Sequence, residues 1–449
     1  MRPFIIYISA LFVVGEVFQF MFRIQKEYVI GCVGKPSSGK STFFSAVTES
    51  TAKIGNYPFT TIEPNIGIAH YVTSCPCKKF NVQCKPIYGY CSEGFRYIPV
   101  KIIDIAGLIP GAHKGIGLGN KFLDDLRIAH VLLHIIDVSG NTNEKGEETI
   151  NYDPIYDHDW LCTEIEMWIF NNIYSNWSSV IRRSKSSNST VTKLLLGQFS
   201  GYGCNESMIL KLVSNLKIND FTDFSTWDKD DIIGLVREFI KIRFPFVIVL
   251  NKSDVVSEQC DSNIVRFYEK YSDKHKIVIA SSLAEYFIKK MVRQNYIKLV
   301  YNTKTYNYDS FITSEELKNG QDISLKKLDC KQKTRLDNIR DMVLFRHGVT
   351  GLQDAINIAI EILDLIPIFL VKNLKNFSNN SSNDDVTNCA FQECILVPNG
   401  ISIKNLAKLL LGNINKKVIS IETVGGIQIS ENQLLSKELN IIKINTEDF

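Results

Sequence analysis

Residues 34–42 read Gly-Lys-Pro-Ser-Ser-Gly-Lys-Ser-Thr and match the pattern G-x-x-x-x-G-K-[ST] in full. The apolar run Tyr28–Val33 precedes the stretch, and residues 43–47 carry an apolar helix face after it, so that a loop joins a buried strand to a helix. Gly34 and Gly39 let the backbone wrap a phosphate group with its N–H groups directed inward. The stretch therefore predicts an α/β fold with a doubly wound, mostly parallel sheet and a nucleotide at the carboxyl ends of its strands.

The loop and the next strand supply the expected phosphate and Mg²⁺ ligands. Lys40 should place its charge on the β- and γ-phosphates, and the Ser41 hydroxyl should ligate Mg²⁺. Asp104 ends the apolar strand Val100–Asp104 and should hold the same ion through water, while the N–H of Gly107 in D-x-x-G should meet the γ-phosphate. We expect phosphate contacts from the whole loop, which consists of Gly34, Lys35, Pro36, Ser37, Ser38, Gly39, Lys40, Ser41 and Thr42.

A third motif predicts which base is read. The apolar run Phe246–Leu250 leads directly into Asn251-Lys252-Ser253-Asp254, which fits N-K-x-D. The Asp254 carboxylate can accept hydrogen bonds from N1–H and the exocyclic amine of guanine, and the Lys252 stem can lie over the base. Adenine lacks that donor pair, and sites built on such bonds reject a mismatched partner by about 10⁴ or more. The motif favours GTP over ATP, with backbone N–H groups for the guanine oxygen expected from Ser281, Ser282 and Leu283.

Two further segments resemble the switches of the Obg–YchF family of P-loop GTPases. Residues 56–67 resemble the first switch, and residues 104–113 and 115–123 resemble the second. The resemblance extends with gaps from Tyr28 to the C-terminus and is closest to the archaeal and eukaryotic branch that keeps N-K-x-D. The YchF-type ATPases of the same family carry a degraded base-reading motif, which again favours GTP here.

The resemblance implies a slow GTPase that yields GDP and phosphate. Thr61, or alternatively Thr60, would close over the γ-phosphate and Mg²⁺. Ras-like proteins orient the attacking water with a Gln directly after D-x-x-G, but this chain has Leu108 there. Hydrolysis must then use another residue, backbone groups, a partner or a monovalent cation. K⁺ is one candidate, although Ser37 occupies the position where some relatives have an Asn that helps to hold this ion.

His113 and His134 could replace the missing Gln, because either imidazole can hydrogen-bond a water molecule. His113 lies in the Gly-rich second switch, and His134 lies on the apolar strand Val131–Ile136. A surface or core role is the simpler interpretation for both residues.

Four cysteines form a group of their own. Cys75, Cys77, Cys84 and Cys91 lie within 17 residues, among prolines and glycines that indicate a loop. Their spacing, C-x-C-x6-C-x6-C, is not the paired C-x2-C typical of zinc sites, so reduced thiols packing a small hairpin are our first interpretation. Four thiolates could also bind Zn²⁺, and a redox-sensitive disulfide is the third alternative.

The composition is that of an ordinary folded protein. The chain has 449 residues, 45% hydrophobic and 22% charged, which excludes disordered, collagen-like and polytopic membrane proteins. Its formal net charge of +3 gives no general attraction to nucleic acid, and we expect no DNA partner. Eleven cysteines in so long a chain indicate a reducing, cytoplasmic compartment rather than a disulfide scaffold.

Residues 1–27 form an apolar N-terminal extension. The first interpretation is that it is not part of the biological protein, which would start near Met21. A membrane-associated segment is the second, although Glu16 would cost a few kcal/mol inside a bilayer. A cleaved signal peptide is the third.

We expect three folded parts. A GTPase domain spans residues 28–140 and 241–365, and a helical subdomain is inserted at residues 141–240. Residues 366–449 alternate strands with one helix, a β-grasp pattern that resembles the TGS domain of the same family. That resemblance implies contact with RNA or the ribosome, for which a basic patch is available at Lys404, Lys408, Lys416 and Lys417, unless these lysines only solvate a helix face.

These observations leave three hypotheses for function. The first is a GTP-hydrolysing switch associated with ribosomes or translation. The second is a nucleotide-gated adaptor that binds RNA or ribosomes and hydrolyses GTP only incidentally. The third is an ATPase like the YchF branch.

Overall fold

The computed structural model describes residues 28–48, 65–108, 110–111, 119–185, 190–219, 222–302, 306–317, 325–379, 389–411 and 418–446. Several positions named above lie outside the described residues, namely the N-terminal extension 1–27, Thr60, Thr61, His113, Lys416 and Lys417. Within the described part of the chain, no helix has both the length and the apolar character needed to cross a membrane.

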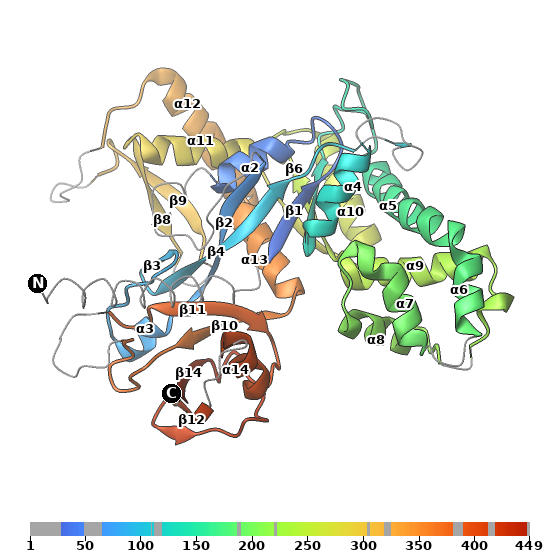
Figure 1. Ribbon diagram of the computed structural model, residues 1–449. Helices are drawn as coiled ribbons and strands as arrows, with labels where there is room; N and C mark the ends of the chain where they lie inside the picture. The colour runs from blue at the N-terminus through green and yellow to red at the C-terminus, as the bar shows by residue number, and fades with distance from the viewer. Residues whose placement is uncertain are drawn as a thin grey trace, which may run out of the picture.

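The main sheet has seven strands in the order β2-β4-β1-β5-β6-β7, with β3 paired to the outer part of β4 (Figure 1). Strands β4, β1, β5, β6 and β7 are parallel, whereas β2 and β3 run antiparallel to β4. The strand bounds are Val29–Val33 (β1), Ile66–Ser74 (β2), Tyr90–Ser92 (β3), Phe95–Asp104 (β4), Val131–Asp137 (β5), Phe246–Asn251 (β6) and Lys276–Ile279 (β7). The prediction of a mostly parallel α/β sheet is confirmed.

Both faces of this sheet are covered. Its central strands are therefore buried on both sides and do not alternate between buried and exposed residues. Every residue of β5 and β6 is buried. Ile30 and Cys32 of β1 pack with one cluster that includes α2 (Lys40–Thr48) and α13 (Leu352–Ile362). Val29 and Val33 point to the opposite face, toward α4 (Gly119–Ile128) and the inserted helices. The doubly wound arrangement follows from this division of side chains between two cores.

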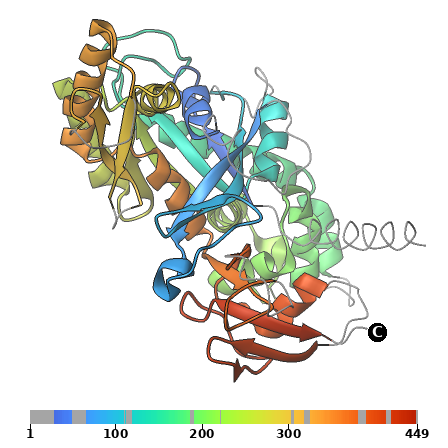
Figure 2. The ribbon, with the colours of Figure 1, turned by 90° about the vertical axis from the view of Figure 1, so that its left-hand side faces the viewer.

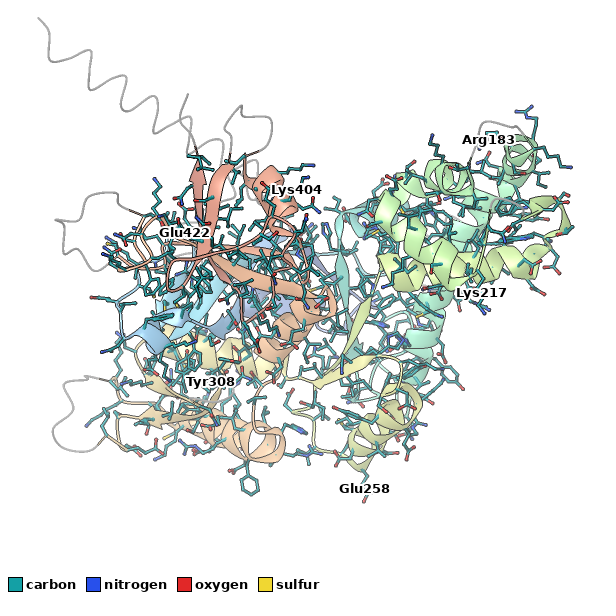
Figure 3. The ribbon with its side chains drawn as sticks, turned by 90° about the horizontal axis from the view of Figure 1, so that it is seen from below. Arg183, Lys217, Glu258, Tyr308, Lys404 and Glu422 are labelled. Atoms are coloured by element: carbon teal, nitrogen blue, oxygen red, sulfur yellow. The ribbon has the colours of Figure 1, made fainter. Side chains whose placement is uncertain are left out.

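Five α-helices lie between β5 and β6 and project to one side of the sheet (Figure 3). They are α5 (Ile155–Ser175), α6 (Trp177–Ser184), α7 (Val191–Phe199), α8 (Glu206–Asn215) and α9 (Lys229–Arg243). The predicted helical insertion is therefore present, although α9 continues past residue 240 and the chain before α5 lies against the phosphate loop. The residue limits of the domains stay a prediction.

A small layer at the other end was not anticipated in detail. Strands β8 (Ile297–Tyr301) and β9 (Tyr308–Thr313) form a separate two-stranded sheet beside α11 (Ser282–Arg293), α12 (Cys330–Ile339) and a π-helical turn, Arg340–Phe345. Figure 2 shows these segments on the opposite side from the C-terminal domain. Several residues of both strands face solvent, so their sequences lack the strongly apolar pattern of a buried strand. For this reason the sequence pattern did not predict them.

The C-terminal domain is a five-stranded mixed sheet with one helix on it. Strand order is β11-β10-β14-β12-β13, with β10 and β14 parallel at the centre. Ile403 and Leu406 of the helix pack on Ile366 and Ile442 of the central strands. This is the predicted β-grasp pattern, with bounds Leu365–Leu370 (β10), Glu393–Pro398 (β11), Ile403–Leu411 (α14), Val418–Thr423 (β12), Ile427–Gln428 (β13) and Ile441–Thr446 (β14).

Arg243 links the inserted helices to the end of α4 and the turn before β5. The Arg243 guanidinium, 3% exposed, donates to the carbonyl oxygens of Tyr202 at 2.7 Å, Ala129 at 2.7 Å and Arg127 at 2.5 Å. Burial lowers the pKa of Arg243 to about 10. The side chain thereby satisfies three carbonyl groups from two separate parts of the chain.

Replacing Arg243 with Met should lower the free energy of unfolding by about 3 kcal/mol or more, because three buried carbonyl groups lose their donors. The matched control is Arg237→Met, since the ion pair of Arg237 with Glu166 is exposed and should contribute less than about 1 kcal/mol. Urea unfolding of both variants measures the difference. Equal losses would contradict the anchoring role of Arg243.

Candidate nucleotide-binding site

The phosphate loop between β1 and α2 depends on its two motif glycines. Gly34 has φ 148° and Gly39 has φ 94°, which side chains rarely tolerate. A Cβ atom at Gly34 would lie 2.4 Å from the carbonyl oxygen of Ile135, and one at Gly39 would lie 2.3 Å from Nδ2 of Asn251. The neighbouring strands β5 and β6 therefore approach the loop so closely that only glycine fits.

The cationic and metal-ligating side chains of the loop come together as predicted. The Lys40 ammonium is buried and donates to the Lys35 carbonyl oxygen at 2.7 Å. Burial lowers the pKa of Lys40, and the nearby Asp104 carboxylate opposes this effect. The Ser41 hydroxyl donates to Asp104 at 2.7 Å. A hydroxyl and a carboxylate placed side by side at the strand ends are the oxygen ligands that Mg²⁺ prefers.

The start of the second switch lies directly against the phosphate loop. A Cβ atom at Gly107 would be 3.2 Å from the Lys40 ammonium and 3.3 Å from the Pro36 nitrogen, so the absent side chain leaves room for close approach. The N–H of Leu108 donates to the Gly34 carbonyl at 3.3 Å. The Leu108 side chain, 2% exposed, belongs to the apolar cluster under α4 and cannot orient a water molecule.

Asn251 forms hydrogen bonds through both ends of its side-chain amide. Its amide nitrogen donates to the Ser38 carbonyl at 2.8 Å, and its amide oxygen accepts bonds from the Ser282 N–H at 3.0 Å and hydroxyl at 2.8 Å. The residue joins the phosphate loop to the segment after β7. It positions both parts of the site and is not directed at a base.

A cavity lies beside Asp254. Asp254 accepts a hydrogen bond from the Ser281 hydroxyl at 2.6 Å. Together with Leu283 and Arg335, Asp254 lines a cavity of about 290 Å³. The N–H groups of Ser281 and Ser282 already donate to Thr350 and Asn251, so among the three predicted contacts for the guanine oxygen, Leu283 is the remaining candidate.

Lys252 is held by an acidic neighbour from β5. Its ammonium lies 2.7 Å from the Asp137 carboxylate. Burial alone would raise the pKa of Asp137, but hydrogen bonds from Lys252, Ser139 and Thr142 lower it overall, so that the carboxylate stays ionised. Lys252 has φ 65°, and the ion pair holds this residue in the left-handed conformation two positions before Asp254.

Helix α5 contacts the site in a way that the sequence did not reveal. The Lys35 ammonium forms an ion pair with Asp157 at 2.8 Å, both side chains being at most 1% exposed, and donates to the Thr142 carbonyl at 2.7 Å. About two turns further along α5, Glu164 accepts a hydrogen bond from the Gly111 N–H at 2.6 Å. A single helix thus contacts both the phosphate loop and the second switch.

His134 is a core residue. It is fully buried on β5, and its Nδ1 lies 3.1 Å from Nδ1 of His158. Burial lowers the pKa of both imidazoles, so this pair is neutral. The simpler interpretation of His134 therefore holds.

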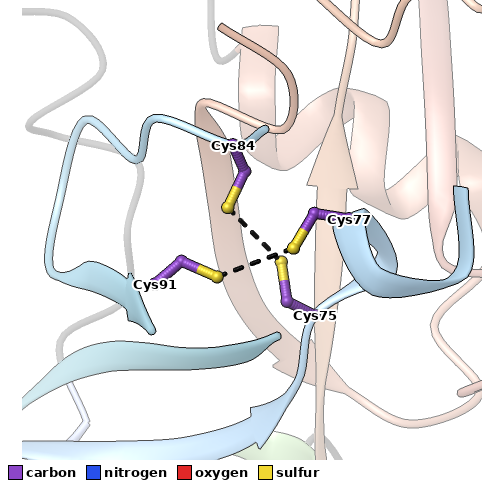
Figure 4. A group of neighbouring side chains, drawn as sticks. All are labelled: Cys75, Cys77, Cys84 and Cys91. Carbon is purple, nitrogen blue, oxygen red and sulfur yellow. Dashed lines mark hydrogen bonds between the residues drawn. The ribbon is translucent and has the colours of Figure 1, made fainter. Parts of the chain in front are cut away.

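The structure also brings the four predicted cysteines together, away from the phosphate loop. The Sγ atoms of Cys75, Cys77, Cys84 and Cys91 all lie within 4.8 Å of one another (Figure 4). The sequence suggested the group, but its unusual spacing gave no guarantee that the sulfur atoms would meet.

The sheet, the phosphate loop and the Asn-Lys-x-Asp segment define a P-loop nucleotide-binding protein of the GTPase class. Two family models agree with this assignment. One, described as a 50S ribosome-binding GTPase, matches residues 29–161. The other, described as the G4 motif-containing domain of Obg-like GTPase YGR210-like proteins, matches residues 249–373.

Full-length relatives extend the match over most of the chain. A GTP-binding protein of Schizosaccharomyces pombe is 42% identical over 88% of this chain and 93% of its own length. One from Methanocaldococcus jannaschii is 36% identical over 93% of this chain and 98% of its own. The crystal structure of a GTP-binding protein from Pyrococcus horikoshii OT3 has 25% identity and a TM-score of 0.66, over 93% and 99% of the two chains. The chain therefore belongs to the Obg-like, YchF-related family of P-loop GTPases.

Replacing Asp157 with Leu should lower the free energy of unfolding by about 3–5 kcal/mol, because the buried Lys35 ammonium loses its counter-charge. The double variant Lys35→Met/Asp157→Leu should lose less than the single variant, since no unpaired charge remains. Urea unfolding of the unchanged protein, the single variants Lys35→Met and Asp157→Leu, and the double variant measures this coupling. Losses that simply add would show that the two charges do not act as a pair.

Proposed function

We propose that the protein binds GTP and GDP in preference to ATP and hydrolyses GTP slowly to GDP and phosphate. The observation that carries the proposal is Asp254, which follows β6 and borders a cavity, with its carboxylate oriented by the Ser281 hydroxyl. Guanine offers this carboxylate two donors on one edge. Adenine offers no such pair and would leave the carboxylate with only its bond from Ser281.

The phosphate end of the nucleotide would lie in the loop of residues 34–42. Lys40 would release its bond to the Lys35 carbonyl and donate to the phosphates. Ser41, Asp104 and the predicted Thr61 would hold Mg²⁺, which offsets phosphate charge when bound. The Gly107 N–H would meet the γ-phosphate, because no side chain separates it from Lys40.

Hydrolysis would be slow without help. Leu108 is turned into the core, so the position that holds a water-orienting Gln in Ras-like proteins contributes nothing to the attacking water. A partner or a monovalent cation would supply the missing assistance. K⁺ is the cation that we propose, with Ser37 in place of the amide ligand that some relatives use.

The nucleotide state would be passed on through the second switch. Gly111 is bonded to Glu164, and Lys35 to Asp157, so α5 would respond to changes in both the switch and the phosphate loop. The output would be a change in affinity for the ribosome or its RNA, in the cytoplasm. The TGS-like C-terminal domain would make the contact. Lys404, which is labelled in Figure 3, and Lys408 are both exposed on α14.

The buried Leu108 also supports a second candidate, the nucleotide-gated adaptor in which hydrolysis is incidental. Both candidates share the guanine site and the ribosomal partner. They differ in whether the partner accelerates hydrolysis.

Changing Asp254 to Asn should convert the base preference from guanine to xanthine, because the new amide donates where the carboxylate accepted. We expect affinity for GDP to fall by about 100-fold or more and affinity for XDP to rise. The matched control is Asp273→Asn, the same change at an exposed position outside the site. Fluorescence titration with labelled nucleotides measures both. Unchanged GDP affinity in the Asp254 variant would remove the basis of the proposal.

Purified ribosomes or large subunits should raise the GTP hydrolysis rate by at least about tenfold, since a partner can complete a site that lacks its water-orienting group. The rate is measured as phosphate release, with Lys40→Ala protein as the control for contaminating activity. GTP-dependent ribosome binding without any acceleration would instead establish the adaptor.

A further inference from the structure

The cysteine cluster is built from four separate backbone positions. Cys75 directly precedes the short helix α3 (Pro76–Phe80), and Cys77 lies within it. Cys84 lies in the following loop, and Cys91 lies on β3. In Figure 4 the four side chains point toward one common centre. The shortest sulfur separations are 3.9 Å for Cys75 and Cys84 and 3.6 Å for Cys77 and Cys91.

These separations are those of a metal tetrahedron. Thiolates bind Zn²⁺ at about 2.3 Å, which places neighbouring sulfur atoms roughly 3.8 Å apart. A disulfide would require about 2.05 Å and a defined dihedral angle. Zinc binding would release the protons of the four thiols. Thiolates are the form that binds metal.

Backbone hydrogen bonds hold the cysteines in place. The Cys75 N–H donates to the Gly94 carbonyl at 2.8 Å, and the Val82 N–H donates to the Cys77 carbonyl at 3.0 Å. Asn81, with φ 50°, ends α3 in the left-handed conformation.

The C-terminal domain is docked on this same segment. The Ala390 N–H donates to the Gln83 carbonyl and the Lys85 N–H to the Ala390 carbonyl, both at 3.2 Å, so backbone pairing brackets Cys84. The Ile87 N–H donates to the Gln392 carbonyl at 2.9 Å. Cys84 therefore lies within residues 83–87, the strip of chain that pairs with residues 390–392.

Side chains reinforce this docking. The Arg96 guanidinium, 1% exposed, donates to the carbonyl oxygens of Phe391 at 3.0 Å and Gln392 at 3.1 Å. Phe80 packs on Phe377 with ring centroids 4.5 Å apart, and Phe377 stacks on Phe391 at 4.8 Å. Phe377 and Phe391 belong to the same hydrophobic core as Cys75 and Cys77. The cysteine segment and the C-terminal domain therefore stabilise each other's position.

We propose that Cys75, Cys77, Cys84 and Cys91 bind one structural Zn²⁺ ion, and that this ion fixes the loop on which the C-terminal domain docks. Four protein ligands leave no open coordination position, which excludes a catalytic role for the ion. The cluster adjoins Ser74 and Phe95, which are paired at the opposite end of β2 and β4 from Asp104. Ten strand residues put roughly 30 Å between the cluster and the phosphate loop.

The test begins with metal content. Full-length protein, purified without chelator, should contain about one zinc per chain by plasma mass spectrometry. Cys84→Ser should lose most of it, while Cys330→Ser, the same change at an exposed cysteine on α12, should keep it. Replacement of the ion by Co²⁺ should give the visible absorption of a tetrahedral thiolate site. Less than 0.2 zinc per chain with all eleven thiols titratable would establish reduced thiols, and two or four missing thiols would establish disulfides; either result overturns the proposal.

The second part tests the docking role by hydrogen exchange. In the Cys84→Ser protein, amides of residues 83–87 and 390–392 should exchange at least tenfold faster than in the unchanged chain. GDP affinity should stay the same, which shows that the GTPase domain is folded. Zinc removal from the unchanged protein with a mercurial reagent should reproduce the effect without a substitution. Bound zinc whose removal leaves residues 390–392 equally protected would refute the docking role.

Discussion

The nucleotide site depends on one side chain, the amide of Asn251. It holds the Ser38 carbonyl of the phosphate loop with one end and the Ser282 segment with the other, at distances of 2.8–3.0 Å. The amide occupies the space that a Cβ atom at residue 39 would need, which makes Gly39 obligatory. Three loops from β1, β6 and β7 are thereby fixed at one edge of the sheet, so that phosphate and base subsites have a constant spacing.

Strand β4 connects this edge to the other specialised end of the molecule. Its last residue, Asp104, bonds to Ser41 at the phosphate loop. Near its first residue, Arg96 is buried beneath the C-terminal domain, next to the cysteine cluster. The strand is paired along its whole length with β2, which gives the two ends a rigid link. The nucleotide site and the contact with the C-terminal domain therefore lie at opposite ends of the same strand.

The sequence predicted the elements that local patterns encode. The phosphate loop, Asp104, the strand before Asn251 and the C-terminal mixed sheet were all found where the motifs and apolar periods placed them. The ion pair of Lys35 with Asp157 was not predicted, because neither residue belongs to a pattern that specifies the other. Likewise, the pattern N-K-x-D did not predict that the Asn251 amide is hydrogen-bonded to Ser38 and Ser282.

The central claim is that Asp254 selects guanine, and calorimetric titration of the unchanged protein tests it most directly. A chain beginning at Met21 would be titrated with GTP and ATP in the presence of Mg²⁺. The account predicts that GTP binds at least about 100-fold more tightly than ATP, since adenine offers the Asp254 carboxylate no pair of donors. ATP that binds as tightly as GTP, or more tightly, would contradict it and place the chain with the ATPase branch.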